Sequence, residues 1–266
     1  MSYGAGRVRV FIGSTPATRI AAKVLECSII RRTDMQVDFT HMHGQEWEYE
    51  TSKLPGGCDA YVLRRWMIPA VVGYSGLAIY LDAASLVTYD IWDLWTKPLQ
   101  TVRTGTIWCT YQDAKPDSGV MLIDCERAKD QWVFDIHAVA KFLGAKRKTH
   151  TLAAIQACAH TTQAPNRIED SWLCRDYFQP GKTKLIHYPN TAAQPWPWLT
   201  GTHPFALPWE MELSIAIHAG FVPVEILTEA LALWGTDDPR AMHPDYERFI
   251  PSRRTARRSQ RKKVAS

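Results

Sequence analysis

A carboxylate that follows a buried strand is the first feature of this sequence that could do chemistry. Residues 77–81 form a short, nearly all-apolar run after Gly76, which is typical of a strand buried on both faces. Asp82 is the first charged residue after that run. Open α/β sheets bind their ligands at the carboxyl ends of the strands, so Asp82 is a candidate binding residue. Aspartate is also a common turn former, and a turn-capping role is the alternative.

The segments before Asp82 predict the strand and helix units that would position it. Residues 7–12 alternate into an apolar run and end at the turn 13–16, which indicates a strand. Residues 17–30 carry apolar side chains at helical spacing, and residues 36–39 predict the next strand. A nucleotide-binding α/β half begins with strand, helix and strand, although many other α/β proteins begin in the same way.

Two adjacent arginines lie in a predicted helix just before the Asp82 strand. Residues 61–72 are apolar on one helical face, and Arg64 and Arg65 stand within them. One of two adjacent residues must point inward, so one of the two arginines is a candidate for a functional contact. An exposed helix face is the alternative.

The rest of the chain predicts further strands and a helical end. Residues 106–111 indicate a strand, and residues 117–124 indicate a turn that leads into another. Residues 129–143 and 149–159 are helical in pattern, and the chain from about residue 199 predicts a helical C-terminal cap. We therefore expect a single domain over residues 1–251, followed by a disordered basic tail over 252–266.

The segment around Asp82 resembles a known motif. Tyr80-Leu-Asp-Ala-Ala-Ser-Leu-Val87, followed by Tyr89-Asp-Ile-Trp-Asp-Leu-Trp95, is similar to the strand and metal motif of nucleotide-sugar glycosyltransferases of the GT-A fold, most nearly the glycogenin-like family. That family has a second Asp where this chain has Ala84. The resemblance implies an α/β, Rossmann-like mixed central sheet flanked by helices.

Two later segments carry the same resemblance. Asp117-Ser-Gly-Val-Met-Leu-Ile-Asp124 is similar to a family signature whose Asn-x-Gly turn touches the sugar, with Asp117 in place of Asn. Aspartate keeps a hydrogen-bond acceptor there but loses the amide donor. The segment His187 to Trp196 is similar to the family's His-x-x-Gly-x-x-Lys-Pro-Trp, with Gln194 in place of Lys.

The resemblance implies a set of site residues. Asp82 and His187 would hold a divalent cation, Mn²⁺ or Mg²⁺, and Asp117 and Asp170 would be catalytic, with Glu169 as the alternative to Asp170. An ordinary salt bridge or cap is a competing role for that acid pair. The implied contacts to the nucleotide-sugar are Phe11, Ile12, Gly13, Arg65, Asp82, Ser118, Gly119, Gln194 and Trp196.

The implied activity is transfer of a sugar from a UDP-type donor to a hydroxyl acceptor. A cation on Asp82 and His187 would act as a Lewis acid on the leaving diphosphate. A catalytically inactive nucleotide-sugar-binding module is the alternative, because Ala84 and Gln194 remove a ligand and a charge.

Charge and composition bear on the partners. The formal net charge is +4, but residues 252–266 hold seven of the 31 Lys and Arg and no acid, which leaves the body at 24 basic against 27 acidic side chains. Such a tail is either a solubilising segment or an electrostatic arm for a polyanion such as nucleic acid or for an anionic membrane surface. We expect the polyanion, with an acceptor such as a hydroxymethyl pyrimidine in DNA and a saccharide as the alternative. The sequence has no apolar run of membrane-spanning length and no signal peptide, and we expect a cytoplasmic protein.

Overall fold

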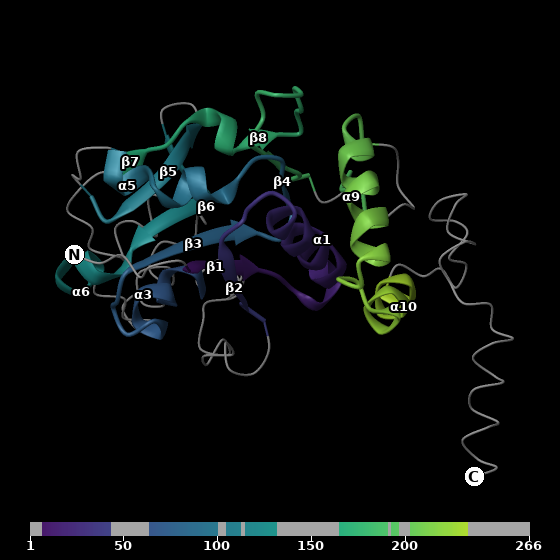
Figure 1. Ribbon diagram of the computed structural model, residues 1–266, viewed down its shortest axis with the longest axis horizontal. Coiled ribbons are helices and arrows are strands. Elements are labelled where there is room, and N and C mark those ends of the chain that lie inside the picture. The colour runs from purple at the N-terminus through teal and green to yellow at the C-terminus, as the bar shows by residue number, and fades with distance from the viewer. Residues whose placement is uncertain are drawn as a thin grey trace, which may run out of the picture.

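The computed structural model describes residues 7–43, 64–100, 105–112, 115–131, 165–190, 193–196 and 203–233 (Figure 1). The first half of the chain contains β1 (Arg7–Gly13), η1 (Pro16–Thr18), α1 (Arg19–Ile30), β2 (Gln36–His41), η4 (Arg65–Met67), α3 (Ile68–Val71), β3 (Leu77–Asp82), β4 (Ser85–Val87), α4 (Ile91–Trp95) and α5 (Lys97–Gln100). The second half contains β5 (Ile107–Gln112), β6 (Lys115–Asp124), α6 (Cys125–Gln131), β7 (Asn166–Arg167), η5 (Asp170–Trp172), β8 (Cys174–Arg175), β9 (Leu185–His187), α9 (Ala206–His218) and α10 (Val224–Leu233).

The main sheet is mixed, as the resemblance implied. Its order is β2-β1-β3-β6-β5-β7. β1 runs parallel to β2 and β3, whereas β6 is antiparallel to both β3 and β5. The carboxyl ends of β1, β2 and β3 therefore meet at one edge of the sheet, where Gly13 pairs with Asp82.

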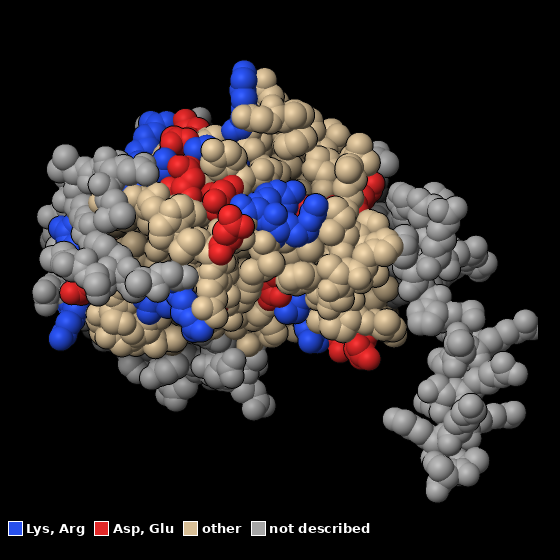
Figure 2. Space-filling model, viewed as in Figure 1, with Lys and Arg blue, Asp and Glu red and all other residues tan. Residues whose placement is uncertain are grey.

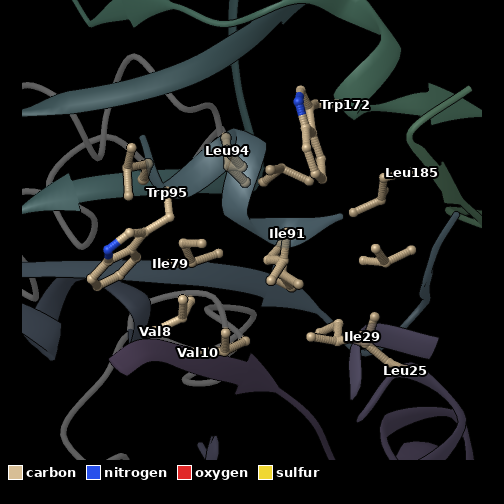
Figure 3. Packing of buried hydrophobic residues seen from close by; sticks show 14 of the residues in the cluster. Val8, Val10, Leu25, Ile29, Ile79, Ile91, Leu94, Trp95, Trp172 and Leu185 are labelled. Atoms are coloured by element: carbon tan, nitrogen blue, oxygen red, sulfur yellow. The ribbon is translucent and has the colours of Figure 1, made fainter. Parts of the chain in front are cut away.

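The prediction that β3 is buried on both faces is confirmed. Leu77, Ile79 and Leu81 point to the face covered by α1 and α4, where they join Leu25, Ile29, Ile91 and Leu94. Figure 3 shows Ile79 among these four side chains. Ala78 and Tyr80 point to the opposite face and pack with Trp66, Ile68 and Ala128 of η4, α3 and α6. Because successive side chains of a strand alternate, Asp82 shares its face with Tyr80.

A second, small sheet lies next to this edge and has the order β4-β9-β8. Ser85 of β4 pairs with His187 of β9, and His187 also pairs with Arg175 of β8. The small sheet thereby places three polar residues in one row across three strands.

Two C-terminal helices lie in the segment predicted as a helical cap. α9 stands beside α1 with α10 at its end (Figure 1), and Trp209, Leu213 and Ala216 of α9 pack with Ile20 and Val24 of α1. Buried Glu212 accepts hydrogen bonds from Arg31 and Arg32, each 2.8 Å long, and so ties α9 to the end of α1.

Several predictions fall on residues outside those that the structure describes. They are most of the helices predicted over 129–143 and 149–159, and the basic tail over 252–266. α6, which ends at Gln131, covers the start of the first of these helices. Among the described residues, no helix has the length and apolar character that crossing a bilayer requires.

Candidate functional site

Asp82 stands at the end of β3 with its side chain 17% exposed. Tyr80, two residues earlier on the same face, donates a hydrogen bond from its hydroxyl to Asp82 Oδ1 at 2.8 Å. The backbone carbonyl of Gly13 accepts a hydrogen bond from Ala83 N, which fixes the chain just after the carboxylate. Asp82 is therefore held at the carboxyl edge of the sheet by groups from β1 and β3.

Arg65 lies against the same carboxylate. Of the two adjacent arginines, Arg65 is buried, whereas Arg64 is partly exposed and donates to the carbonyl of Met42. Arg65 Nη2 is 3.8 Å from Asp82 Oδ1, and its guanidinium lies over the Tyr80 ring at 4.5 Å. Its Nη1 donates to the carbonyl and hydroxyl of Ser118 at 2.7 and 2.9 Å.

A break in the pairing of β5 and β6 turns Ser118 toward Arg65. Cys109 pairs with Met121, but the next residue of β5, Thr110, pairs with Asp117. Three residues of β6 therefore lie opposite no residue of β5 at this point, which is the geometry of a bulge. The Ser118 carbonyl is thereby available to accept from Arg65.

His187 faces Asp82 from the small sheet. Its Nε2 is 3.6 Å from Asp82 Oδ2, and the residue is only 5% exposed. Burial lowers the pKa of His187 below its ordinary value; the Asp82 carboxylate opposes this shift, and the Arg175 guanidinium adds to it. The imidazole is therefore neutral at pH 7 and keeps a nitrogen lone pair for a ligand.

Asp117 has both carboxylate oxygens engaged. Oδ1 accepts from the backbone N–H of Gly119 at 2.9 Å, which closes a local turn. Oδ2 accepts from Arg175 through Nε at 3.1 Å and also through Nη2. A methyl group at Gly119 would lie 3.4 Å from His187 Cε1, so this turn directly adjoins the imidazole.

Asp82 and His187 fit a divalent cation as two ligands. Ligand atoms about 2.1 Å from one ion lie roughly 3–4 Å apart, and the observed separation of 3.6 Å falls in that range. No third Asp, Glu, His or Cys side chain among the described residues completes such a group. The other coordination positions would be filled by phosphate oxygens and water.

Other predicted site residues lie apart from this set of contacts. The Asp170 side chain is 64% exposed and accepts from Arg167, while Glu169 accepts from Lys97 and Lys184. Gln194 Nε2 donates to the carbonyl of Tyr188, and Trp196 is buried against Tyr188 and Trp209.

The end of β1 offers backbone groups. The side chains of Phe11 and Ile12 are buried in the two core clusters on opposite faces of the sheet. The Ile12 carbonyl accepts from Met42 N at 2.9 Å. Any contact of this segment to a nucleotide base would therefore have to come from its backbone.

Sequence reasoning missed Arg175. It stands in a strand of two residues, β8, whose neighbours along the chain give no periodic signal. Its place beside His187 follows from the parallel pairing of β8 with β9 and from its ion pair with Asp117, 58 residues earlier. Neither contact has a local signature in the sequence.

Comparisons with known proteins identify the fold. No family model and no curated protein sequence matches this chain. Among solved structures, the galactosyltransferase LgtC in complex with donor and acceptor sugar analogs aligns with a TM-score of 0.61 at 11% identity, over 83% of this chain and 99% of that one. The bifunctional glycosyltransferase WbbM aligns at 0.61 and 12% identity over 87% of this chain. The glycosyltransferase GlyE of Streptococcus pneumoniae aligns at 0.57 and 14% identity over 81% of this chain.

The extent of these matches limits what they imply. This chain spans 53% of the WbbM chain and 64% of the GlyE chain, but nearly all of LgtC. At such low identity the likeness concerns the fold, and the nearer resemblance to the glycogenin-like family stays a prediction. The mixed sheet, its flanking helices and these alignments show that the chain has the GT-A fold of glycosyltransferases.

Proposed function

We propose that this protein is a glycosyltransferase that moves a sugar from a UDP-type donor to a hydroxyl acceptor. The observation that carries the proposal is the meeting of Asp82, His187 and Arg65 at the carboxyl edge of the sheet, because open α/β sheets bind ligands there. The similar galactosyltransferase LgtC was crystallised with donor and acceptor sugar analogs, which supports a nucleotide-sugar site on this fold.

The side chains around Asp82 suit the departure of a nucleoside diphosphate. Negative charge develops on the leaving phosphate as the glycosidic bond breaks, so positive groups placed beforehand lower the barrier. Arg65 is fixed by Ser118 and by the Tyr80 ring, and its guanidinium therefore needs little reorganisation to face that charge. Asp82 and His187 would hold Mn²⁺ or Mg²⁺, which when bound supplies Lewis-acid stabilisation of the leaving group.

The two predicted catalytic carboxylates, Asp117 and Asp170, have different environments. Asp117 accepts from Arg175 and from Gly119 N, so it positions the turn that carries Ser118 and Gly119. Asp170 is exposed and bound only to an exposed arginine among the contacts described, so it can exchange that partner for an acceptor hydroxyl. We assign the contact with the acceptor to Asp170 and the positioning of the sugar-binding turn to Asp117.

The acceptor proposal rests on the basic tail. In Figure 2, acidic and basic side chains on the visible face lie close to one another rather than in separate patches, as expected for a body of nearly balanced charge. Seven positive charges in residues 252–266 are the strongest feature for a polyanion, and we propose a hydroxymethyl pyrimidine in DNA ahead of a saccharide.

Donor hydrolysis and binding test this proposal together. The protein is incubated with a panel of nucleotide-sugars, with and without Mn²⁺, and both thermal stabilisation and release of the nucleoside diphosphate are measured. A ligand at a hundredfold excess over its Kd should stabilise the fold by about 2.7 kcal/mol. Stabilisation without turnover, even with acceptors supplied, would favour the inactive binding module. No stabilisation by any nucleotide of the panel would refute the nucleotide-sugar site.

A further inference from the structure

Arg175 is the most accessible charged group in the cluster around His187. Its side chain is 35% exposed, against 9% for Asp117 and 5% for Arg65. Arg65 is buried and already donates to the carbonyl and hydroxyl of Ser118. Of the two arginines that the cluster contains, Arg175 is therefore the one that a ligand arriving from solvent reaches first.

The small sheet places the side chains of Arg175 and His187 on the same face. Ser85, His187 and Arg175 are direct neighbours across β4, β9 and β8, so their side chains share one face of that sheet. His187 faces Asp82 from this row. Within the described part of the chain, the buried Ser85 Oγ and His187 Nδ1 have no hydrogen-bond partner, so the row also holds unused polar atoms.

Asp117 fixes the orientation of the Arg175 guanidinium. The Asp117 carboxylate accepts hydrogen bonds from Nε and Nη2 of the guanidinium. Among the described residues, Nη1 donates to no partner, so its N–H groups can bind a ligand. An arginine held along one edge by a carboxylate presents the other edge to an anion, and phosphate matches that planar geometry. Asp117 is thus a positioning residue that orders the side chain before a ligand binds.

The charge balance of the cluster favours this use of Arg175. The carboxylates of Asp82 and Asp117 balance the guanidiniums of Arg65 and Arg175. A nucleoside diphosphate brings further negative charge to this point, where Ala84 and Gln194 supply none of the opposite sign. An arginine that can turn toward the phosphates offsets part of that charge even without a metal ion.

We propose that Arg175 binds the diphosphate of the nucleotide donor directly, positioned by Asp117, and that it sustains donor binding in the absence of a divalent cation. This inference rests on the proposed function. It adds to that function a specific phosphate-binding residue and a donor affinity that depends only partly on metal.

Binding selectivity tests the assignment. Kd is measured by titration calorimetry for UDP and for uridine, in EDTA and in Mn²⁺, with the parent protein, Arg175→Gln, Arg175→Lys and Arg167→Gln. Arg167→Gln is the matched control, because Arg167 also forms an ion pair with an aspartate but on the exposed surface. UDP and uridine differ only in the phosphates, so their affinity ratio reports the phosphate contact and is insensitive to a general loss of folding.

The expected result is that the parent binds UDP in EDTA, and that Arg175→Gln lowers the UDP-to-uridine affinity ratio by roughly tenfold or more, the size of one charge-assisted hydrogen bond. Arg175→Lys should recover part of the ratio, and Arg167→Gln should leave it unchanged. An unchanged ratio in Arg175→Gln, or UDP binding by the parent only with Mn²⁺, would overturn the assignment but leave the proposed function standing. If the parent binds none of UDP, ADP, GDP, CDP or TDP under either condition, the proposed function itself fails.

Discussion

Gly13→Ala should disturb the candidate site through the Tyr80 ring. A methyl group at residue 13 would overlap the Tyr80 hydroxyl and lie 2.8 Å from its Cζ, closer than carbon atoms pack. Tyr80 is fully buried, so its ring can move only by displacing neighbours in the core. The same ring carries the hydrogen bond to Asp82 and lies under the Arg65 guanidinium, so both contacts would be strained with it.

The size of the effect follows from overpacking of a close-packed core. Such insertions cost about 1–3 kcal/mol, which for a domain of this size corresponds to a fall in Tm of roughly 2–12 °C. Gly119→Ala is a comparison at the same site, because its methyl group would lie no closer than 3.3 Å to any neighbour and should need only a small adjustment. We therefore expect Gly13→Ala to be clearly less stable than Gly119→Ala.

Urea denaturation of a double-mutant cycle checks this reasoning. Tyr80→Phe removes the hydroxyl, which is the atom of closest overlap, so Gly13→Ala should cost less in the Tyr80→Phe background than in the parent. UDP affinity should fall in Gly13→Ala as well, because Asp82 and Arg65 lose their alignment. Equal free energies of unfolding for Gly13→Ala and the parent, or strict additivity with Tyr80→Phe, would refute the argument.

Four further experiments test other parts of the protein. Asp82→Asn and His187→Ala should each lower turnover by about a hundredfold or more, because a preorganised electrostatic contact is lost. Circular dichroism should show that both variants keep the fold. Turnover near that of the parent in either variant would show that the residue is not part of the site. Hydrogen bonds from Lys184 and then Lys97 lower the pKa of Glu169 from its ordinary value of 4.5 to about 2. The stability that these two ion pairs add is therefore complete above pH 4.5 and is lost as the pH falls toward 2. Lys184→Met should flatten that acid loss in thermal melts, and Lys182→Met, whose lysine is exposed, should not. Burial raises the pKa of Cys27 to about 11 and of Cys109 and Cys125 to about 12, so among the described cysteines a thiol reagent at neutral pH should label Cys174 first, by peptide mapping. Deleting residues 252–266 should weaken DNA binding and reduce the slope of log K against log salt by about 0.9 per lost phosphate contact on a duplex, without changing UDP affinity; equal DNA affinity of both forms would direct the acceptor search to saccharides.

The parts of the fold that the sequence predicted are those with a local signal. The apolar run of 77–81 predicted β3 because a strand with both faces buried needs apolar side chains on both. The helical spacing within 17–30 predicted α1, whose observed bounds are Arg19–Ile30. Of the two adjacent arginines, Arg65, which the resemblance singled out, is the one whose side chain is buried.

The parts that the sequence did not predict depend on distant pairing. β8 and β9 have two and three residues, too few to show a period, and their order beside β4 is set by tertiary contacts. The break between Cys109 and Thr110 falls at the turn predicted at the start of 117–124, but the sequence did not predict that both sides of the turn pair with β5. Arg175 could not be found for the same reason.

Trp196 packs in the core next to the strand that carries His187. The resemblance implied a nucleotide contact, but the ring is buried between Tyr188 and Trp209. Tyr188 directly follows His187, and its hydroxyl donates to the carbonyl of Phe205, just before α9. A three-residue strand makes few hydrogen bonds of its own, so we expect the aromatic packing beside β9 to help keep His187 at 3.6 Å from Asp82. We therefore expect the Pro-Trp segment to support the imidazole from the core side, because the Trp196 indole is buried there.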